Sequence, residues 1–343
     1  MLRRLISVGF FLALILVSIT ASLKFWVESS LDSPMQVSEQ GYILEVKSGS
    51  SLNQLSRELA GNGFIDSPYP LIIYSRFDRL EHIQVGEYQL EHRITPRQMI
   101  AKLVSGDVIQ YQVTFPEGRS LSQWIGILNL HPRFEKQTPV SLEMLEEAFD
   151  PPEGGSLEGW FFPDTYIFRS VDTAMTILEQ AHAKMVSLLA EEWSKRSPEL
   201  PVENAYEALI LASIIEKETG LAEERPAIAG VFTRRLQMGM KLQTDPTVIY
   251  GLGDEYDGNL TRAHLKAENP YNTYFIDRLP PTPIANPGRE SIHAALHPKG
   301  GTEVYFVARG DGSHQFSTTL EQHLDAVKRF QLRRVKNYRS APQ

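Results

Sequence analysis

The sequence predicts an α+β protein with an N-terminal transmembrane helix, a small α+β module and a larger mixed α+β domain. Three observations support this prediction. An apolar run covers residues 5–23, and short alternating and helical patterns follow one another over residues 42–110. Longer helical patterns and a hairpin pattern then occupy residues 156–338, so we expect two folded parts behind a membrane segment.

The composition narrows the possible function classes. The 343 residues carry a formal net charge of -8, which argues against nucleic acid as a partner because phosphate binding needs clustered lysine and arginine. A hydrophobic content of 42% is enough for one or two sizeable cores. Cysteine is absent, which excludes disulfides and thiolate chemistry and suits an oxidising compartment.

The N-terminal segment predicts a single-pass anchor in the cell inner membrane within residues 1–27. Arg3 and Arg4 precede the apolar run, which is long enough for a helix of about 20 residues across a bilayer. A cleaved signal peptide is the alternative, but its apolar region is about 7–15 residues long, and Thr20-Ala21-Ser22 is a weak cleavage site. The positive-inside rule then places both arginines in the cytoplasm and the bulk of the chain in the periplasm.

The region behind the anchor predicts a tether and then the small module. Residues 28–41 are polar and show no periodic pattern, which is typical of a tether. The module begins with a strand pattern at residues 42–46, after which Ser48-Gly49-Ser50 turns the chain and leucines recur at helical spacing. A second strand is expected at residues 83–90 and a short helix at residues 96–103.

A weak internal repeat and a boundary follow the module. Residues 46–54 recur loosely as residues 113–123, so the pattern of strand, turn and helix occurs twice. The acidic stretch at residues 146–155, with its prolines and glycines, breaks the periodicity. We therefore assign residues 111–155 to a connecting region between the module and the larger domain.

Helical patterns dominate the larger domain. Apolar residues recur at three and four positions over residues 172–195, and a third helix is expected over residues 226–239. Between them, a helix should begin after Asn204, with Glu207 as its capping-box partner, and run to Gly220. The remaining expected elements are a proline-rich loop at 279–288, a short helix, a hairpin of 304–308 with 314–317, and a terminal helix from Leu320.

The helix after Asn204 carries the main catalytic candidate, Glu218. Ile215, Ile214 and Leu211 lie three, four and seven residues before Glu218 and form an apolar stripe with it, whereas Glu216 points about 200° away. Partial burial and the negative end of the helix dipole both raise the pKa of a carboxyl group there. A carboxyl group that stays protonated at neutral pH can protonate the oxygen of a leaving sugar.

The alternative for Glu218 is a structural salt bridge with Lys217, Arg225 or another cation, which the pattern alone favours. Three flanking segments favour the catalytic role over the salt bridge, because they offer amide, hydroxyl and aromatic groups of the kind that bind sugars. They are residues 158–166, 242–251 and 271–274. Capping is the simpler role for Asp245, and core packing or turn formation is the simpler role for each segment alone. The expected substrate-binding residues are Gln243, Thr244, Asp245, Tyr250, Tyr271, Asn272, Thr273 and Tyr274.

The sequence predicts neither a metal nor a cofactor. His293 and His297 lie four residues apart and could clasp a metal ion, but no third ligand is evident. No phosphate-binding loop, G-x-S-x-G motif or dinucleotide fingerprint occurs.

Five ordered motifs carry a resemblance to a known family. They are Glu158-Gly-Trp-Phe-Phe-Pro-Asp-Thr165, Ala212-Ser-Ile-Ile-Glu-Lys-Glu-Thr219, Leu242-Gln-Thr-Asp-Pro-Thr-Val-Ile-Tyr-Gly251, Tyr271-Asn-Thr-Tyr274, and Leu279-Pro-Pro281 with Ile284-Ala285 and Pro287-Gly288. Through these motifs the chain resembles the endolytic murein transglycosylases of the YceG-like family, over nearly its whole length.

The resemblance implies a LysM-like module over residues 42–110 and a catalytic domain over residues 156–338. It implies a lytic transglycosylase that cleaves the bond between N-acetylmuramic acid and N-acetylglucosamine inside nascent peptidoglycan strands, leaves 1,6-anhydro ends and so ends strand elongation. In the Glu-Lys-Glu-Thr motif the second glutamate, Glu218, is the implied general acid and base. The implied partners are glycan strands, the membrane and peptidoglycan synthases of the penicillin-binding protein class.

Two other functions stay open at this point. A hydrolytic muramidase would need a second carboxylate, about 5–5.5 Å or 6.5–9.5 Å from the first depending on stereochemistry, and Asp245 or Asp164 would be its candidate. A non-catalytic wall-binding scaffold for the synthases would need no acid at all. The reaction products distinguish the three functions.

Overall fold

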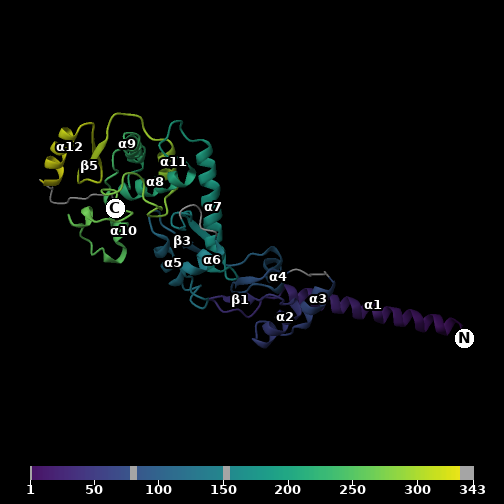
Figure 1. Cartoon of the computed structure of the whole chain (residues 1–343). Helices are drawn as coiled ribbons and strands as arrows, with labels where there is room; N and C mark the ends of the chain where they lie inside the picture. Colours follow the sequence, from purple (N-terminus) through teal and green to yellow (C-terminus); the bar gives the residue numbers. More distant parts are fainter. Residues whose placement is uncertain (1, 78–82, 150–154, 333–343) are drawn as a thin grey trace. The chain divides into compact units, whose positions relative to one another are not determined.

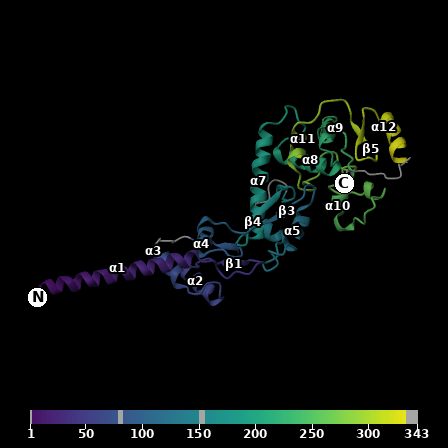
Figure 2. The same cartoon turned by 180° about the vertical axis from the view of Figure 1, so that it is seen from behind.

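The structure, a computed structural model, describes residues 2–77, 83–149 and 155–332. The chain divides into two compact units, drawn in Figure 1 and from behind in Figure 2. The first unit comprises residues 1–111 and 167–172, and the second comprises residues 112–166 and 173–343. Helices predominate in these residues, and the strands among them form three two-stranded sheets, so the predicted mixed α+β class is confirmed.

Where the structure describes it, the first unit is built from the antiparallel pair β1 and β2 and the helices α1 to α4. Tyr42 of β1 lies opposite Leu90 of β2, and Val46 lies opposite Gly86. Alternate residues of β1, among them Leu44, face a core shared with the helices. The elements are α1 (Leu2–Asp32), β1 (Tyr42–Val46), α2 (Leu52–Gly61), α3 (Tyr69–Phe77), β2 (Gly86–Leu90) and α4 (Pro96–Ser105).

Helix α1 has an exposed apolar part followed by a part that packs on the first unit. By length and composition it could cross a membrane, a property that an N-terminal signal sequence shares. The tether expected at residues 28–41 is wrong in its first part, because α1 continues to Asp32 and packs against α3 and α4. Leu31, Met35 and Val37 are buried in the core, so these few apolar residues fix the segment despite its polar composition.

The internal repeat corresponds to a shared helix start. Ser51 before α2 and Ser120 before α5 each accept a hydrogen bond from the backbone of a glutamine three residues later. The side chains of those glutamines, Gln54 and Gln123, bond back to the cap backbone. The repeated sequence is therefore a capping box after a strand and turn, and Thr95 forms a third before α4.

The second unit begins at Gln112, so most of the expected connecting region belongs to it. Trp124, Leu128 and Leu145 are fully buried, which explains why residues 112–149 fold with the larger domain. Part of the predicted boundary, residues 150–154, lies outside the described residues. The division between the units falls within β3 (Gln110–Thr114) and β4 (Thr165–Arg169), which pair with each other.

Helix α8 lies at the centre of the second unit and contacts α7, α9, α10 and α11. Every residue from Ala208 to Ile215 is buried, and in Figures 1 and 2 α7 runs beside α11 and α8. The principal helices are α5 (Leu121–Asn129), α6 (Leu142–Ala148), α7 (Ala174–Ser194), α8 (Ala205–Glu218), α9 (Arg225–Gln237), α10 (Asp245–Leu252), α11 (Arg289–Leu296) and α12 (Leu320–Val327).

The remaining elements are short. Strands β5 (Tyr305–Ala308) and β6 (His314–Ser317) form the expected antiparallel hairpin. The turns are η1 (Ala222–Glu224), η2 (Gly253–Glu255), η3 (His264–Lys266) and the π-helical turn η4 (Lys328–Leu332).

The start of α8 agrees with the sequence, although only half of the expected capping box forms. Asn204 Oδ1 accepts a hydrogen bond from the Glu207 backbone N–H at 2.8 Å. The Glu207 carboxylate instead accepts from the Glu203 backbone N–H. The helix ends at Glu218, two residues before Gly220, and so leaves Glu218 on its last turn.

Candidate active site

Glu218 is the half-buried last residue of α8. Its Oε1 accepts a hydrogen bond from the hydroxyl of Thr244. Burial, with a smaller contribution from the negative charge of Asp245, raises the pKa of Glu218 to about 7, while the Thr244 hydrogen bond and Arg235 oppose this rise. The carboxyl group therefore exists in both protonation states near neutral pH, as acid and base catalysis requires.

The salt-bridge alternative for Glu218 is not what the structure shows. Lys217 Nζ donates to the Gly118 carbonyl oxygen at 3.0 Å, and Arg225 pairs with Glu216 at 3.3 Å. Both expected cations therefore bind other groups, and Glu218 is left facing Thr244.

Glu216 holds the structural ion pair instead. Its Oε1 binds buried Arg225, and its Oε2 accepts from the Gly288 N–H at 3.0 Å and from Ser291 Oγ at 2.7 Å. These partners tie the end of α8 to the start of α11. The two glutamates therefore have separate environments, as the helical rotation between them predicts.

The segment that begins α10 provides the hydrogen-bond donor to Glu218. Asp245 was expected to cap this helix, but it is the first helical residue, and Thr244 occupies the cap position. Thr244 makes no side-chain cap hydrogen bond because its hydroxyl donates to Glu218. Exposed Asp245 accepts at Oδ1 from the Tyr274 hydroxyl at 2.6 Å.

Threonine side chains fix this segment to the loop around Thr273. The Thr244 N–H donates to Thr273 Oγ1 at 3.0 Å, and Thr273 Oγ1 lies 2.8 Å from Thr247 Oγ1. Gln243 has a left-handed backbone with φ of 50°, and its N–H donates to the Thr273 carbonyl at 3.1 Å. The Gln243 side chain is exposed, so this unusual backbone presents it to solvent beside Thr244.

Two residues expected to bind substrate are buried and bonded within the protein. Asn272 is 0% exposed, and its Nδ2 donates to the carbonyl oxygens of His264, Leu265 and Ala267. Thr273 is also 0% exposed. Both side chains, expected from the sequence to contact substrate, are enclosed in this structure, where their hydrogen bonds shape the loop.

The aromatic residues of the expected set are half-buried. Tyr250 and Tyr271 lie with ring centroids 5.0 Å apart, and the Tyr271 hydroxyl is 2.9 Å from Thr282 Oγ1. Burial and the charge of Asp245 raise the pKa of Tyr274, so its hydroxyl stays protonated and donates. Tyr250, Tyr271 and Tyr274 thus combine partly accessible rings with fixed hydroxyls.

Glu158 is an acidic residue to which the sequence assigned no role. It is 6% exposed, and its Oε1 accepts from the Leu121 N–H at 3.0 Å and from Asn286 Nδ2 at 3.3 Å. Its Oε2 accepts from the Tyr250 hydroxyl at 3.3 Å. Burial raises its pKa to about 7 against these hydrogen bonds. Its place at the start of the Glu-Gly-Trp motif was the available signal.

The second-carboxylate candidates differ in their surroundings. Asp164 pairs with Lys184, which holds the pKa of Asp164 below its usual range. Asp245 is bonded to Tyr274 and affects Glu218 through its charge. Of the two, Asp245 is the one whose charge influences the pKa of Glu218.

Comparisons with known proteins show which family the chain resembles. The YceG-like family model matches residues 44–329. The chain is 31% identical over 304 residues to the endolytic murein transglycosylase of Bacillus subtilis (strain 168), with 84% of each chain covered. It is 25% identical over 337 residues to the protein of that name from Streptococcus pneumoniae serotype 2, covering 87% of this chain and 60% of the relative.

A solved structure is also similar. The crystal structure of a YceG-like protein from Listeria monocytogenes matches with a TM-score of 0.53 and 29% sequence identity, covering 84% of this chain and 99% of that one. Because the family match spans far more than half of the sequence, the chain belongs to the YceG-like family.

Proposed function

We propose that this protein is an endolytic lytic transglycosylase that cleaves the bond between N-acetylmuramic acid and N-acetylglucosamine within nascent peptidoglycan strands, with Glu218 as its general acid and base. The half-buried position of Glu218 against Thr244, with a pKa of about 7, is the observation that carries the proposal. Membership of the YceG-like family and the names of the Bacillus and Streptococcus relatives support the reaction class.

The proposed reaction uses Glu218 twice. Protonated Glu218 gives its proton to the glycosidic oxygen as the bond to C1 of N-acetylmuramic acid breaks. The resulting carboxylate then takes the proton of the C6 hydroxyl of that sugar, whose oxygen attacks C1. The products are a new free hydroxyl on one fragment and a 1,6-anhydro ring on the other, and no water is consumed.

The residues around Glu218 have proposed supporting roles. Thr244 orients the carboxyl group, and Asp245 keeps it partly protonated through its charge. Gln243, Tyr250, Tyr271 and Tyr274 are proposed to contact the glycan, because their side chains are exposed or half-buried.

The surroundings of the enzyme follow from the same proposal. Residues 5–23 would anchor the chain in the inner membrane, with the part of the chain after residue 27 in the periplasm where peptidoglycan lies. Residues 42–110 would form the LysM-like module, and peptidoglycan synthases would be partners. Finding a mature N-terminus near Ser22 would exclude the anchor.

The test is to incubate the purified full chain in detergent with intact glycan strands and determine the product masses. A lytic transglycosylase gives 1,6-anhydro ends from within the strand, whereas a muramidase gives reducing ends that are heavier by one water. Glu218→Gln should abolish product release, while Glu223→Gln, at an exposed glutamate of η1, should not. Undiminished turnover by a folded Glu218→Gln protein would reject the assignment, and inactivity of the wild-type protein would favour a scaffold.

A further inference from the structure

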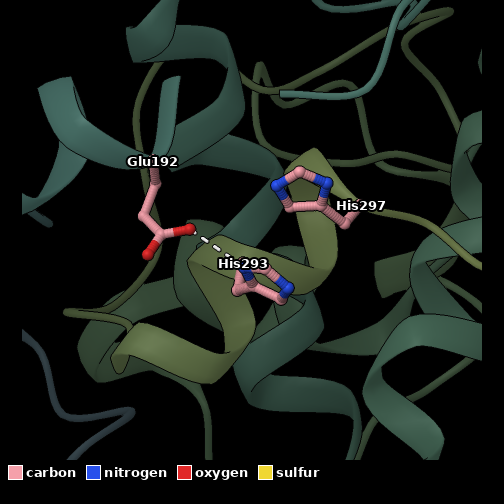
Figure 3. Close-up of side chains that lie close together, drawn as sticks. All are labelled: Glu192, His293 and His297. Carbon is pink, nitrogen blue, oxygen red and sulfur yellow. Dashed lines mark hydrogen bonds and ion pairs between the residues drawn. The ribbon is translucent and has the colours of Figure 1, made fainter. Parts of the chain in front are cut away.

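A carboxylate and two imidazoles meet on α7 and α11. Within the described part of the chain, Glu192, His293 and His297 each offer one ligand atom, and these atoms lie within 4.8 Å of one another. Figure 3 shows the Glu192 carboxylate directed at His293 of α11, with His297 directly after the end of that helix. His293 Nδ1 is 2.9 Å from Glu192 Oε2, and the two rings are 4.3 Å apart by their centroids.

The structure therefore supplies the third ligand that the sequence lacked. His293 lies on the last turn of α11 and His297 caps that helix, four residues later, so the two rings lie close together. Glu192 comes from α7, about one hundred residues earlier, and its side chain is 7% exposed, whereas that of His293 is 57% exposed. The buried carboxylate and the accessible imidazoles leave an approach from solvent.

The donor set suits zinc or a similar divalent transition metal. Two histidines and one carboxylate form a recognised zinc set that leaves a fourth position for water. Ligands bound tetrahedrally at about 2.0–2.1 Å lie roughly 3.3–3.4 Å from one another. The Glu192 and His293 atoms, 2.9 Å apart, are already near this spacing. The ligand atom of His297 lies within 4.8 Å of both, so a small rotation of its side chain would bring it to the same spacing.

Neighbouring groups hold these ligands in place. Arg289 Nη1 donates to Glu192 Oε1 at 3.0 Å, which leaves Oε2 for the metal side. Ser197 Oγ lies 3.3 Å from His297 Nδ1, so the other nitrogen of this ring is available as a ligand. Such outer contacts orient the ligands of metal sites. The alternative is a structural ion pair of Glu192 with Arg289 and His293. Such an ion pair does not explain why His297 also lies beside these groups.

We propose that Glu192, His293 and His297 bind a divalent transition-metal ion of the zinc type that fastens α7 to α11. The first turn of α11 already binds the end of α8 through Glu216 and Ser291. A metal at the other end of α11 would therefore fix both ends of the helix. Its role is to stabilise the second unit, and it takes no part in the reaction at Glu218.

The test uses the full chain in detergent, freed of metal with a chelator and titrated with zinc chloride against a chromophoric chelator. One equivalent of zinc should bind, and at about 100 times the dissociation constant it should raise the melting temperature by about 5–10 °C. Magnesium, which prefers oxygen ligands, should have no such effect. The double variant His293→Gln with His297→Gln, and Glu192→Gln, should each weaken zinc binding at least tenfold.

The matched control is His92→Gln, at an exposed histidine of the first unit whose ring bonds to the Val37 carbonyl. It should keep full zinc binding. A wild-type protein without a zinc-dependent shift, or a double variant that binds zinc as tightly as the wild type, would overturn the proposal. X-ray absorption of the zinc-loaded wild type, independent of any variant, should show two imidazoles at about 2.0–2.1 Å; a shell of oxygens alone would also overturn it.

Discussion

The hydroxyl of Thr244 donates a hydrogen bond to Oε1 of Glu218, so the cap residue of α10 is joined to the last residue of α8. This bond favours the ionised carboxylate, while burial and Asp245 favour the protonated acid. The opposing effects leave the pKa of Glu218 at about 7, which suits a group that first gives and then takes a proton.

The first prediction concerns the pH dependence of cleavage. If protonated Glu218 starts the reaction, kcat/KM should be nearly constant below pH 6 and fall about tenfold per pH unit above the Glu218 pKa of about 7. The initial rate of anhydro-product release by the full chain between pH 5 and pH 9 measures this. A rate that rises steadily across pH 7 would show that the ionised form acts first.

The second prediction concerns Thr244. Thr244→Val removes the hydrogen bond that lowers the Glu218 pKa, so the alkaline fall in rate should move to higher pH. The carboxyl group also loses its orientation, and kcat should decrease by about 10- to 100-fold. Thr244→Ser keeps the hydroxyl and is the matched control. A valine variant with an unchanged pH profile would contradict the role assigned to this bond.

The third prediction concerns stability. The folded-state pKa of Glu218, about 7, is raised above its ordinary value of 4.5. Below pH 4.5 the Glu218 carboxyl group is protonated in both the folded and the unfolded protein, so it does not affect the free energy of unfolding. As the pH rises from 4.5 to 7, this group ionises in the unfolded protein while it stays largely protonated in the folded protein, so the free energy of unfolding decreases. Glu218→Gln should therefore match the wild type near pH 4 and exceed its stability at pH 8 by up to about 3 kcal/mol.

Calorimetry of the full chain at several pH values would measure this difference. Glu216→Gln is the control on the same helix, two residues away. It weakens the bond to buried Arg225, so it should destabilise the protein at pH 8. A Glu218→Gln variant that loses stability at pH 8 to the same extent would mean that the carboxylate is stabilised in the folded protein.

Features set by neighbouring residues could be predicted from the sequence. The helical period placed Glu218 on the apolar stripe and Glu216 elsewhere, and the two residues have different partners as a result. Asn204 caps α8 as expected. Capping and periodicity involve residues within a few positions of one another, so the sequence itself contains the relevant distances.

Contacts between distant segments could not be predicted in this way. Thr244 lies 26 residues from Glu218, and Glu192 lies 101 residues from His293. The spacing of His293 and His297 at the end of α11 indicates that the two are neighbours, but it does not say which helix packs there. The third ligand candidate therefore became visible only when α7 was placed beside α11.

Residue type alone also misjudged burial. Asn272 has the amide group that a sugar site uses, but the same group closes a loop by binding three backbone carbonyls. Leu31 and Met35 stand in a polar segment without periodicity, yet both are buried. One or two apolar residues can fix a segment when a partner surface is available, and that surface lies outside the local pattern.

The fourth prediction concerns Glu158. Glu158→Ala removes the acceptor of the Leu121 N–H, and a buried donor without a partner costs about 1–3 kcal/mol. Asn286 Nδ2 also loses its bond to Glu158 but keeps its bond to the Arg119 carbonyl oxygen. Glu158→Gln keeps one carbonyl oxygen for Leu121 and should lose less than half as much stability in thermal unfolding. Tyr250 would lose its carboxylate acceptor in both variants, so any change in KM should be similar. Equal stability losses would show that the charge of Glu158, and not its role as an acceptor, holds α5 in place.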